Sequence, residues 1–89
     1  MTGISFEYRI IKKVGGVLWK IRVLRYFLEI AREGNMSRAA ERLHVTQPTL
    51  SKQMKDLEQE LGKKLFKRGS TSVSLTDEGM LLRKRAEDL

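Results

Sequence analysis

The alternation of apolar and polar positions is clearest between residues 37 and 62, where a polar break separates two helical patterns. Ala39, Ala40 and Leu43 give the first pattern a small apolar face, and small residues allow a second helix to cross closely. In the second pattern the apolar side chains recur at steps of four, three and four residues: Leu50, Met54, Leu57 and Leu61. That spacing places them on one face of a helix. The pattern therefore predicts two packed helices joined by a tight turn.

Local signals predict where these two helices begin and end. Ser37 is interpreted as the N-cap of the first helix. His44 lies at the break, and histidine is among the residues that tolerate a positive φ. Thr46 is predicted to cap the second helix, and Pro48 falls in its first turn, where the missing N–H has no cost.

The face of the second helix opposite the apolar stripe is polar and basic near its beginning. Short hydrogen-bonding side chains and cations at the N-terminal end are what a helix in the DNA major groove needs. They are Gln47, Thr49, Ser51, Lys52 and Lys55. The acids Asp56, Glu58 and Glu60 follow, where a docked helix would leave the DNA. A solvated surface helix is the commoner explanation of an isolated amphipathic pattern, but the preceding helix and turn favour a helix–turn–helix.

Before this pair, a helix is predicted from about Trp19 to Glu33, with Gly34 as its stop. One apolar stripe contains Ile21, Leu24, Phe27, Leu28 and Ala31, and a second contains Trp19, Val23, Tyr26 and Ile30. A helix that is apolar on two sides packs against two partners. These would be the helix–turn–helix pair and either a later helix or a partner chain. A single wide core face fits the pattern equally well.

The stretch after Gly62 predicts two short strands, Leu65–Lys67 and Val73–Leu75, around Gly69 and Ser70. A hairpin that follows a recognition helix is a wing, and its cations would meet phosphates: Lys63, Lys64, Lys67 and Arg68. A plain solvated hairpin is the alternative. Thr76 then caps a last helix, whose first turn carries Asp77 and Glu78 in favourable positions for the helix dipole.

Composition narrows the class of partner. The chain has 89 residues, a formal net charge of +7 and no cysteine. This length predicts one domain, and the charge suits an anionic partner, either nucleic acid or a membrane surface. Without cysteine there is no disulfide framework or thiolate metal site. No apolar run reaches membrane-spanning length, so we expect a cytoplasmic protein with no membrane partner. The pattern of residues 1–20 fits a short strand, a basic arm or a poorly ordered terminus.

Residues 21–89 resemble the N-terminal DNA-binding domain of the LysR-type transcriptional regulators. The matching stretches are LRYFLEIAREGNMSRAAERLHVTQPTLSKQMKDLEQELG, KLFKRG and SLTDEG. The resemblance implies a mainly α winged helix–turn–helix with a three-helix core, a small β-hairpin wing and a C-terminal linker helix. Residues 1–18 lie outside the family pattern, residues 19–75 form the domain, and residues 76–89 begin a linker and dimerisation helix that is cut short. The ligand-sensing domain that normally follows is absent, so we expect a fragment or a product without effector control, and no small-molecule effector in this chain.

The resemblance also implies contacts with double-stranded DNA. Gln47, Pro48, Thr49, Ser51 and Lys52 would meet base edges or the groove, and Ser37 and Arg38 match positions near phosphates. The complete predicted DNA-binding set is Ser37, Arg38, Thr46, Gln47, Pro48, Thr49, Ser51, Lys52, Lys55, Lys64 and Arg68. Two positions depart from the family. Lys52 stands where Arg is common, which loses bidentate geometry, and Thr71 stands where a wing-tip Arg is frequent. Arg68 matches the usual Arg after the Leu-Phe pair, in a role that is either structural or DNA-binding.

An enzyme and a protein-interaction module are the two other classes of function. An enzyme finds little support, because His44 has no evident carboxylate or nucleophile partner and no phosphate loop or metal spacing is present. No cofactor is therefore expected. A protein-interaction module that pairs with a full-length relative shares the fold and differs only in its partner.

For assembly we predict a weak homodimer through the helix from Thr76. It would use Met80, Leu81 and Leu82, with Trp19, Val23 and Tyr26 of the first helix alongside. A monomer whose last helix covers its own first helix is the alternative.

Overall fold

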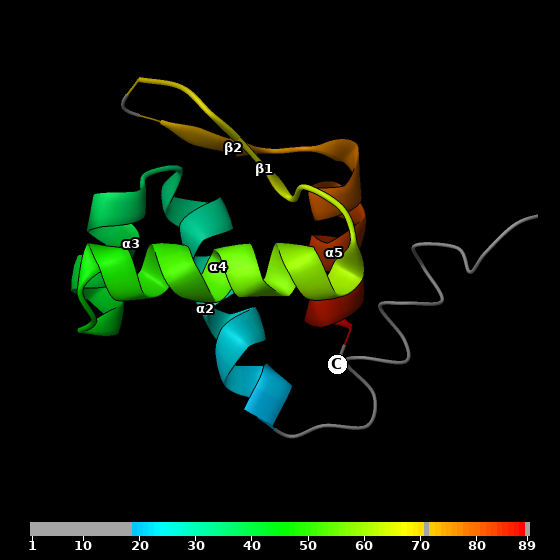
Figure 1. Ribbon diagram of the computed structural model, residues 1–89, viewed down its shortest axis with the longest axis horizontal. Helices are drawn as coiled ribbons and strands as arrows, with labels where there is room; N and C mark the ends of the chain where they lie inside the picture. The colour runs from blue at the N-terminus through cyan, green and yellow to red at the C-terminus, as the bar shows by residue number, and fades with distance from the viewer. Residues whose placement is uncertain (1–18, 71, 89) are drawn as a thin grey trace, which may run out of the picture.

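The computed structural model describes residues 19–70 and 72–88, which form four helices and one hairpin (Figure 1). The elements are α2 (Trp19–Glu33), α3 (Met36–Leu43), α4 (Gln47–Leu61), β1 (Phe66–Arg68), β2 (Val73–Leu75) and α5 (Asp77–Glu87). In Figure 1, α4 crosses in front of α2, with α3 near its first turn and α5 near its last. The predicted mainly helical fold, with a three-helix core, a hairpin and a C-terminal helix, is confirmed. The predictions for residues 1–18 lie outside the described residues.

Helix α2 is the centre of the packing, as its two apolar stripes suggested. Phe27 and Ile30 are fully buried, and Val23 and Leu24 are nearly so. The helix packs against α3, α4 and α5, so its second partner is the later helix. Gly34 ends it with a φ of 66° and donates its N–H to the carbonyl of Ile30 at 2.9 Å. One expectation was wrong, because Ile21 is 57% exposed and lies outside the core.

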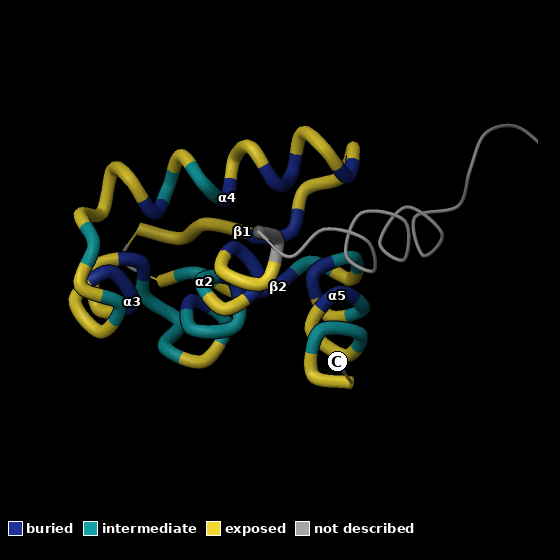
Figure 2. The backbone as a smooth tube through the Cα atoms, turned by 90° about the horizontal axis from the view of Figure 1, so that it is seen from below, coloured by how far each residue is buried: buried dark blue, intermediate teal, exposed yellow. Residues whose placement is uncertain are grey.

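The apolar face of α4 closes this core from one side. Leu50, Met54, Leu57 and Leu61 are all buried, as their spacing predicted. Figure 2 shows the consequence along the helix, where buried segments face the rest of the domain and exposed segments face outward. The outward side of α4 is therefore free to meet a partner.

The hairpin is joined to the helices by side-chain packing and by backbone hydrogen bonds. Its strands pair antiparallel with Phe66 opposite Leu75 and Arg68 opposite Val73. The Phe66 ring packs against the Phe27 ring of α2 at 5.3 Å between centroids, and the Val73 N–H donates to the Gly34 carbonyl at 3.0 Å. The first strand begins at Phe66, one residue later than predicted. The backbone of Leu65 is used instead to bind α4 and the start of α5.

Helix α5 begins where predicted and packs closely against the hairpin. Thr76 caps it, with its hydroxyl oxygen accepting the Gly79 N–H at 3.0 Å. Gly79 is buried, and a Cβ at this position would overlap the carbonyl oxygen of Leu65. A residue without a side chain therefore lets α5 approach the hairpin.

Two of the predicted dimer contacts are wrong. Leu82 is fully buried and Val23 is 4% exposed, so both belong to the core of this chain and are closed to a partner. The packing of α5 against α2 is the arrangement expected of a last helix that covers its own first helix. Met80, by contrast, is 51% exposed, and Leu81 and Tyr26 are half-buried.

Candidate nucleic-acid interface

The N-cap of the first helix of the pair lies two residues earlier than the sequence suggested. Asn35, and not Ser37, is the N-cap of α3, and its side-chain oxygen accepts the Arg38 N–H at 2.9 Å. Ser37 lies inside the first turn instead. Both Ser37 and Arg38 are exposed there, so their side chains are available to a ligand near the N-terminal end of α3. Asparagine is as good an N-cap as serine. Its position directly after Gly34, where the preceding helix ends, is the sequence feature that could have identified Asn35 as the cap.

The turn between the helices has the geometry predicted for it. His44 ends α3 in the left-handed region with φ 59° and ψ 41°. Thr46 caps α4, and its hydroxyl oxygen accepts the Thr49 N–H at 3.3 Å while the hydroxyl group donates to Oγ1 of Thr49 at 2.7 Å. Pro48 is in the first turn of α4, as expected. The hydroxyls of Thr46 and Thr49 are thus linked to each other on the exposed start of the helix.

The exposed side of α4 carries the side chains that the sequence assigned to it. Gln47, Pro48, Thr49, Lys52 and Lys55 are exposed, and Ser51 is half-buried. Lys52 has one partner one turn further on, since its Nζ lies 3.1 Å from Oδ2 of Asp56. Exposed ion pairs of this kind contribute about 0.3–0.5 kcal/mol. Lys52 can therefore exchange Asp56 for a stronger partner at little cost.

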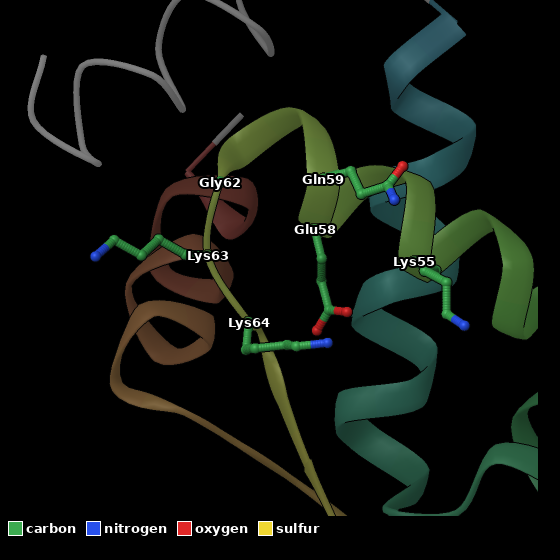
Figure 3. Close-up of a pocket in the computed structure, with 6 residues that line it drawn as sticks. All are labelled: Lys55, Glu58, Gln59, Gly62, Lys63 and Lys64. Carbon is green, nitrogen blue, oxygen red and sulfur yellow. The ribbon is translucent and has the colours of Figure 1, made fainter.

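The cations near the hairpin do not form one patch. Side chains alternate between the two faces of a strand, so Lys67 and Arg68 lie on opposite faces, although both are exposed. Lys63 and Lys64 are also exposed, and Figure 3 shows them pointing in opposite directions from the turn. Thr71, the position of the wing-tip departure, lies outside the described residues.

Glu58 was missed as a buried residue. By sequence it is one of three acids in the part of α4 where a docked helix would leave the DNA, but the residue is only 9% exposed. Oε2 of its carboxylate accepts the N–H of Leu65 at 2.7 Å and of Phe66 at 3.3 Å. The signal was its spacing, because position 58 lies four residues after Met54 and three before Leu61, on the apolar face. Glu58 therefore ties α4 to the hairpin.

A pocket of about 350 Å³ lies beside this connection (Figure 3). Its lining is mostly basic and polar: Lys55, Glu58, Gln59, Gly62, Lys63 and Lys64. In the parts of the chain that the structure describes, no group of three or more His, Cys, Asp or Glu side chains could hold a metal ion. Within the same residues, no helix is long and apolar enough to cross a membrane.

The family described as "Bacterial regulatory helix-turn-helix protein, lysR family" matches residues 21–80. The HTH-type transcriptional regulator BsdA of Bacillus subtilis is 49% identical over 70 residues, which are 78% of this chain and 24% of BsdA. The chain thus spans about a quarter of the length of that relative.

The similar solved structures include complexes with DNA. The CbnR DNA-binding domain in complex with DNA has a TM-score of 0.74 and 41% identity, over 76% of this chain and 78% of that one. The BenM DNA-binding domain with catB site 1 DNA has a TM-score of 0.72 and 41% identity, over 76% and 73% of the two chains.

Proposed function

Since the chain belongs to the lysR family of bacterial regulatory helix–turn–helix proteins, we propose that its domain binds double-stranded DNA sequence-specifically and regulates transcription. One observation carries the proposal. The start of α4 is capped and exposed, and it presents short polar side chains and lysines, while its other face is held by four buried apolar side chains. A helix with this composition and a buried opposite face fits the major groove.

Within that surface we propose two roles. The base-edge and groove contacts come from the first half of α4, from Gln47, Pro48, Thr49, Ser51 and Lys52. The phosphate contacts surround them and come from Ser37, Arg38, Thr46, Lys55, Lys64 and Arg68. Ser37, Arg38 and Thr46 support this division because they are exposed at helix N-termini, where backbone N–H groups and the helix dipole favour anions.

We also propose a weak homodimer that places two recognition helices on neighbouring half-sites. One recognition helix contacts only a few base pairs, and helix–turn–helix dimers bind half-sites about one helical turn apart. Leu82 of α5 is buried within its own chain, whereas Met80 on the same helix is exposed. We therefore place the dimer contact on the exposed side of α5 around Met80. A binding protein of this kind is neither an enzyme nor dependent on a cofactor, and it acts in the cytoplasm, where bacterial DNA lies.

The proposal is tested by selecting duplexes from a random pool with the full chain and measuring affinity across salt concentrations. Binding through phosphates gives a linear fall of log K with log salt, with a slope of about −0.9 per neutralised phosphate. We expect an enriched motif and a steep slope. A chain that enriches no motif, shows no salt-dependent duplex binding and captures a full-length relative would instead be a protein-interaction module.

A further inference from the structure

Glu58 organises the whole turn between α4 and the hairpin. Its main-chain carbonyl accepts the N–H groups of Gly62 at 2.8 Å and Lys63 at 3.2 Å. Its carboxylate accepts those of Leu65 at 2.7 Å and Phe66 at 3.3 Å. One residue of the recognition helix therefore binds four backbone donors in a five-residue segment.

The residue that these four donors surround is Lys64. Its own carbonyl accepts the hydroxyl of Thr76 at 2.7 Å, so the backbone of Lys64 is also held from the start of α5. In Figure 3 the Lys64 side chain runs below the Glu58 carboxylate and ends beside it, while Lys63 points away. The backbone of Lys64 thus has a fixed position relative to the recognition helix.

A carboxylate is a costly choice for this position. Burying a charge is unfavourable unless hydrogen bonds compensate, and an apolar side chain would continue the stripe of Met54, Leu57 and Leu61. Among the residues whose burial is described, Glu58 is the one buried charged side chain. The N–H groups of Leu65 and Phe66 provide that compensation, because both donate to the Glu58 carboxylate.

We propose that Glu58 is a positioning residue for DNA binding, which fixes the turn so that Lys64 meets the phosphate backbone while α4 occupies the groove. This inference rests on the proposed function. A lysine has a long side chain, but its contact with a phosphate depends on where its Cα lies relative to the docked helix. Without the carboxylate, the turn is no longer tied to α4 at Leu65 and Phe66.

The test compares three variants with the same change in charge. Glu58→Gln keeps an acceptor, but a neutral one whose hydrogen bonds are about half as strong. Glu58→Met keeps the length of the side chain and removes the acceptor. Glu60→Gln is the control, since this acid is exposed on the same helix. Lys64→Ala is introduced into the wild type and into each variant, and Lys52→Ala is introduced separately into the same four backgrounds. The salt dependence of duplex binding is then measured for every protein. The temperature is one at which circular dichroism shows each protein to be folded.

In the wild type and in Glu60→Gln, we expect Lys64→Ala to reduce the magnitude of the salt slope by about 0.9, which corresponds to one phosphate contact. The reduction should be smaller in Glu58→Gln and smallest in Glu58→Met. The effect of Lys52→Ala should be the same in all four backgrounds. A merely structural role would weaken binding in proportion to the unfolded fraction and would leave the Lys64 and Lys52 effects unchanged.

Equal Lys64 effects in all backgrounds, or no Lys64 effect in the wild type, would overturn the inference and leave the proposed function intact. If Glu58→Met does not fold, Glu58→Gln against Glu60→Gln decides the question alone. A wild-type chain that binds no duplex would overturn the proposed function, and the inference with it.

Discussion

Replacing Gly79 by alanine tests how closely α5 approaches the hairpin. In most helices this change is favourable, since alanine is better than glycine by about 1 kcal/mol in a helix interior. Here the added Cβ would overlap the Leu65 carbonyl and lie 3.0 Å from Cδ2 of Leu75. The obstacle is backbone, and that carbonyl also accepts the Thr76 N–H at 3.0 Å. It therefore cannot move aside as a flexible side chain would.

Overpacking of this kind costs about 1–3 kcal/mol, and we expect the upper end of that range because backbone must shift. After the gain in helix propensity, the net loss in the free energy of unfolding is about 2 kcal/mol. For a domain of this size the melting temperature should fall by roughly 8–16 °C.

Thermal and urea unfolding of Gly79→Ala measure this loss, and Gly69→Ala is the matched control. A Cβ at Gly69 would lie 3.1 Å from Oγ of Ser72, a side chain that can rotate away. The control should therefore change stability by less than about 0.5 kcal/mol, or raise it slightly. A Gly79→Ala protein as stable as the wild type would refute the close contact between α5 and the hairpin.

Leu57→Ala should lower the free energy of unfolding by about 2–5 kcal/mol, since Leu57 is 3% exposed on the buried face of α4; an unchanged melting temperature would contradict that face. Asn35→Ala should cost about 0.5–2 kcal/mol as a lost N-cap, whereas Ser37→Ala should leave stability nearly unchanged, and the reverse order would restore Ser37 as the cap. Sedimentation with a palindromic duplex should find two chains bound, and Met80→Lys should reduce this to one; a one-to-one complex of the wild type at saturation would exclude the dimer.

The parts of the fold that could be predicted from sequence were those set by local periodicity and local turn chemistry. The spacing of Leu50, Met54 and Leu57 places them on one face of a helix, and this holds whichever segments pack against that face. His44 and Thr46 sit at positions where their own backbone or side chain determines the turn. These signals need no knowledge of distant segments, and the structure confirms them.

The errors concern residues whose environment comes from elsewhere in the chain. Glu58 looks like one of several acids until the hairpin supplies Leu65 and Phe66 as donors. Ile21 shares a stripe with buried residues but lies near the beginning of α2 and is 57% exposed. Leu82 fits a dimer seam by pattern, and only the packing of α5 on α2 shows that its own chain covers it.

The central claim is that α4 reads base pairs while the surrounding cations hold the backbone. It is tested most directly by comparing Lys52→Ala with Lys64→Ala on the selected duplex and on a scrambled duplex of equal length. We expect Lys52→Ala to lose about 1–3 kcal/mol on the selected duplex and much less on the scrambled one. Lys64→Ala should weaken binding to both by the same factor. Equal, sequence-independent losses from both substitutions would contradict the claim and show that α4 does not lie in the groove.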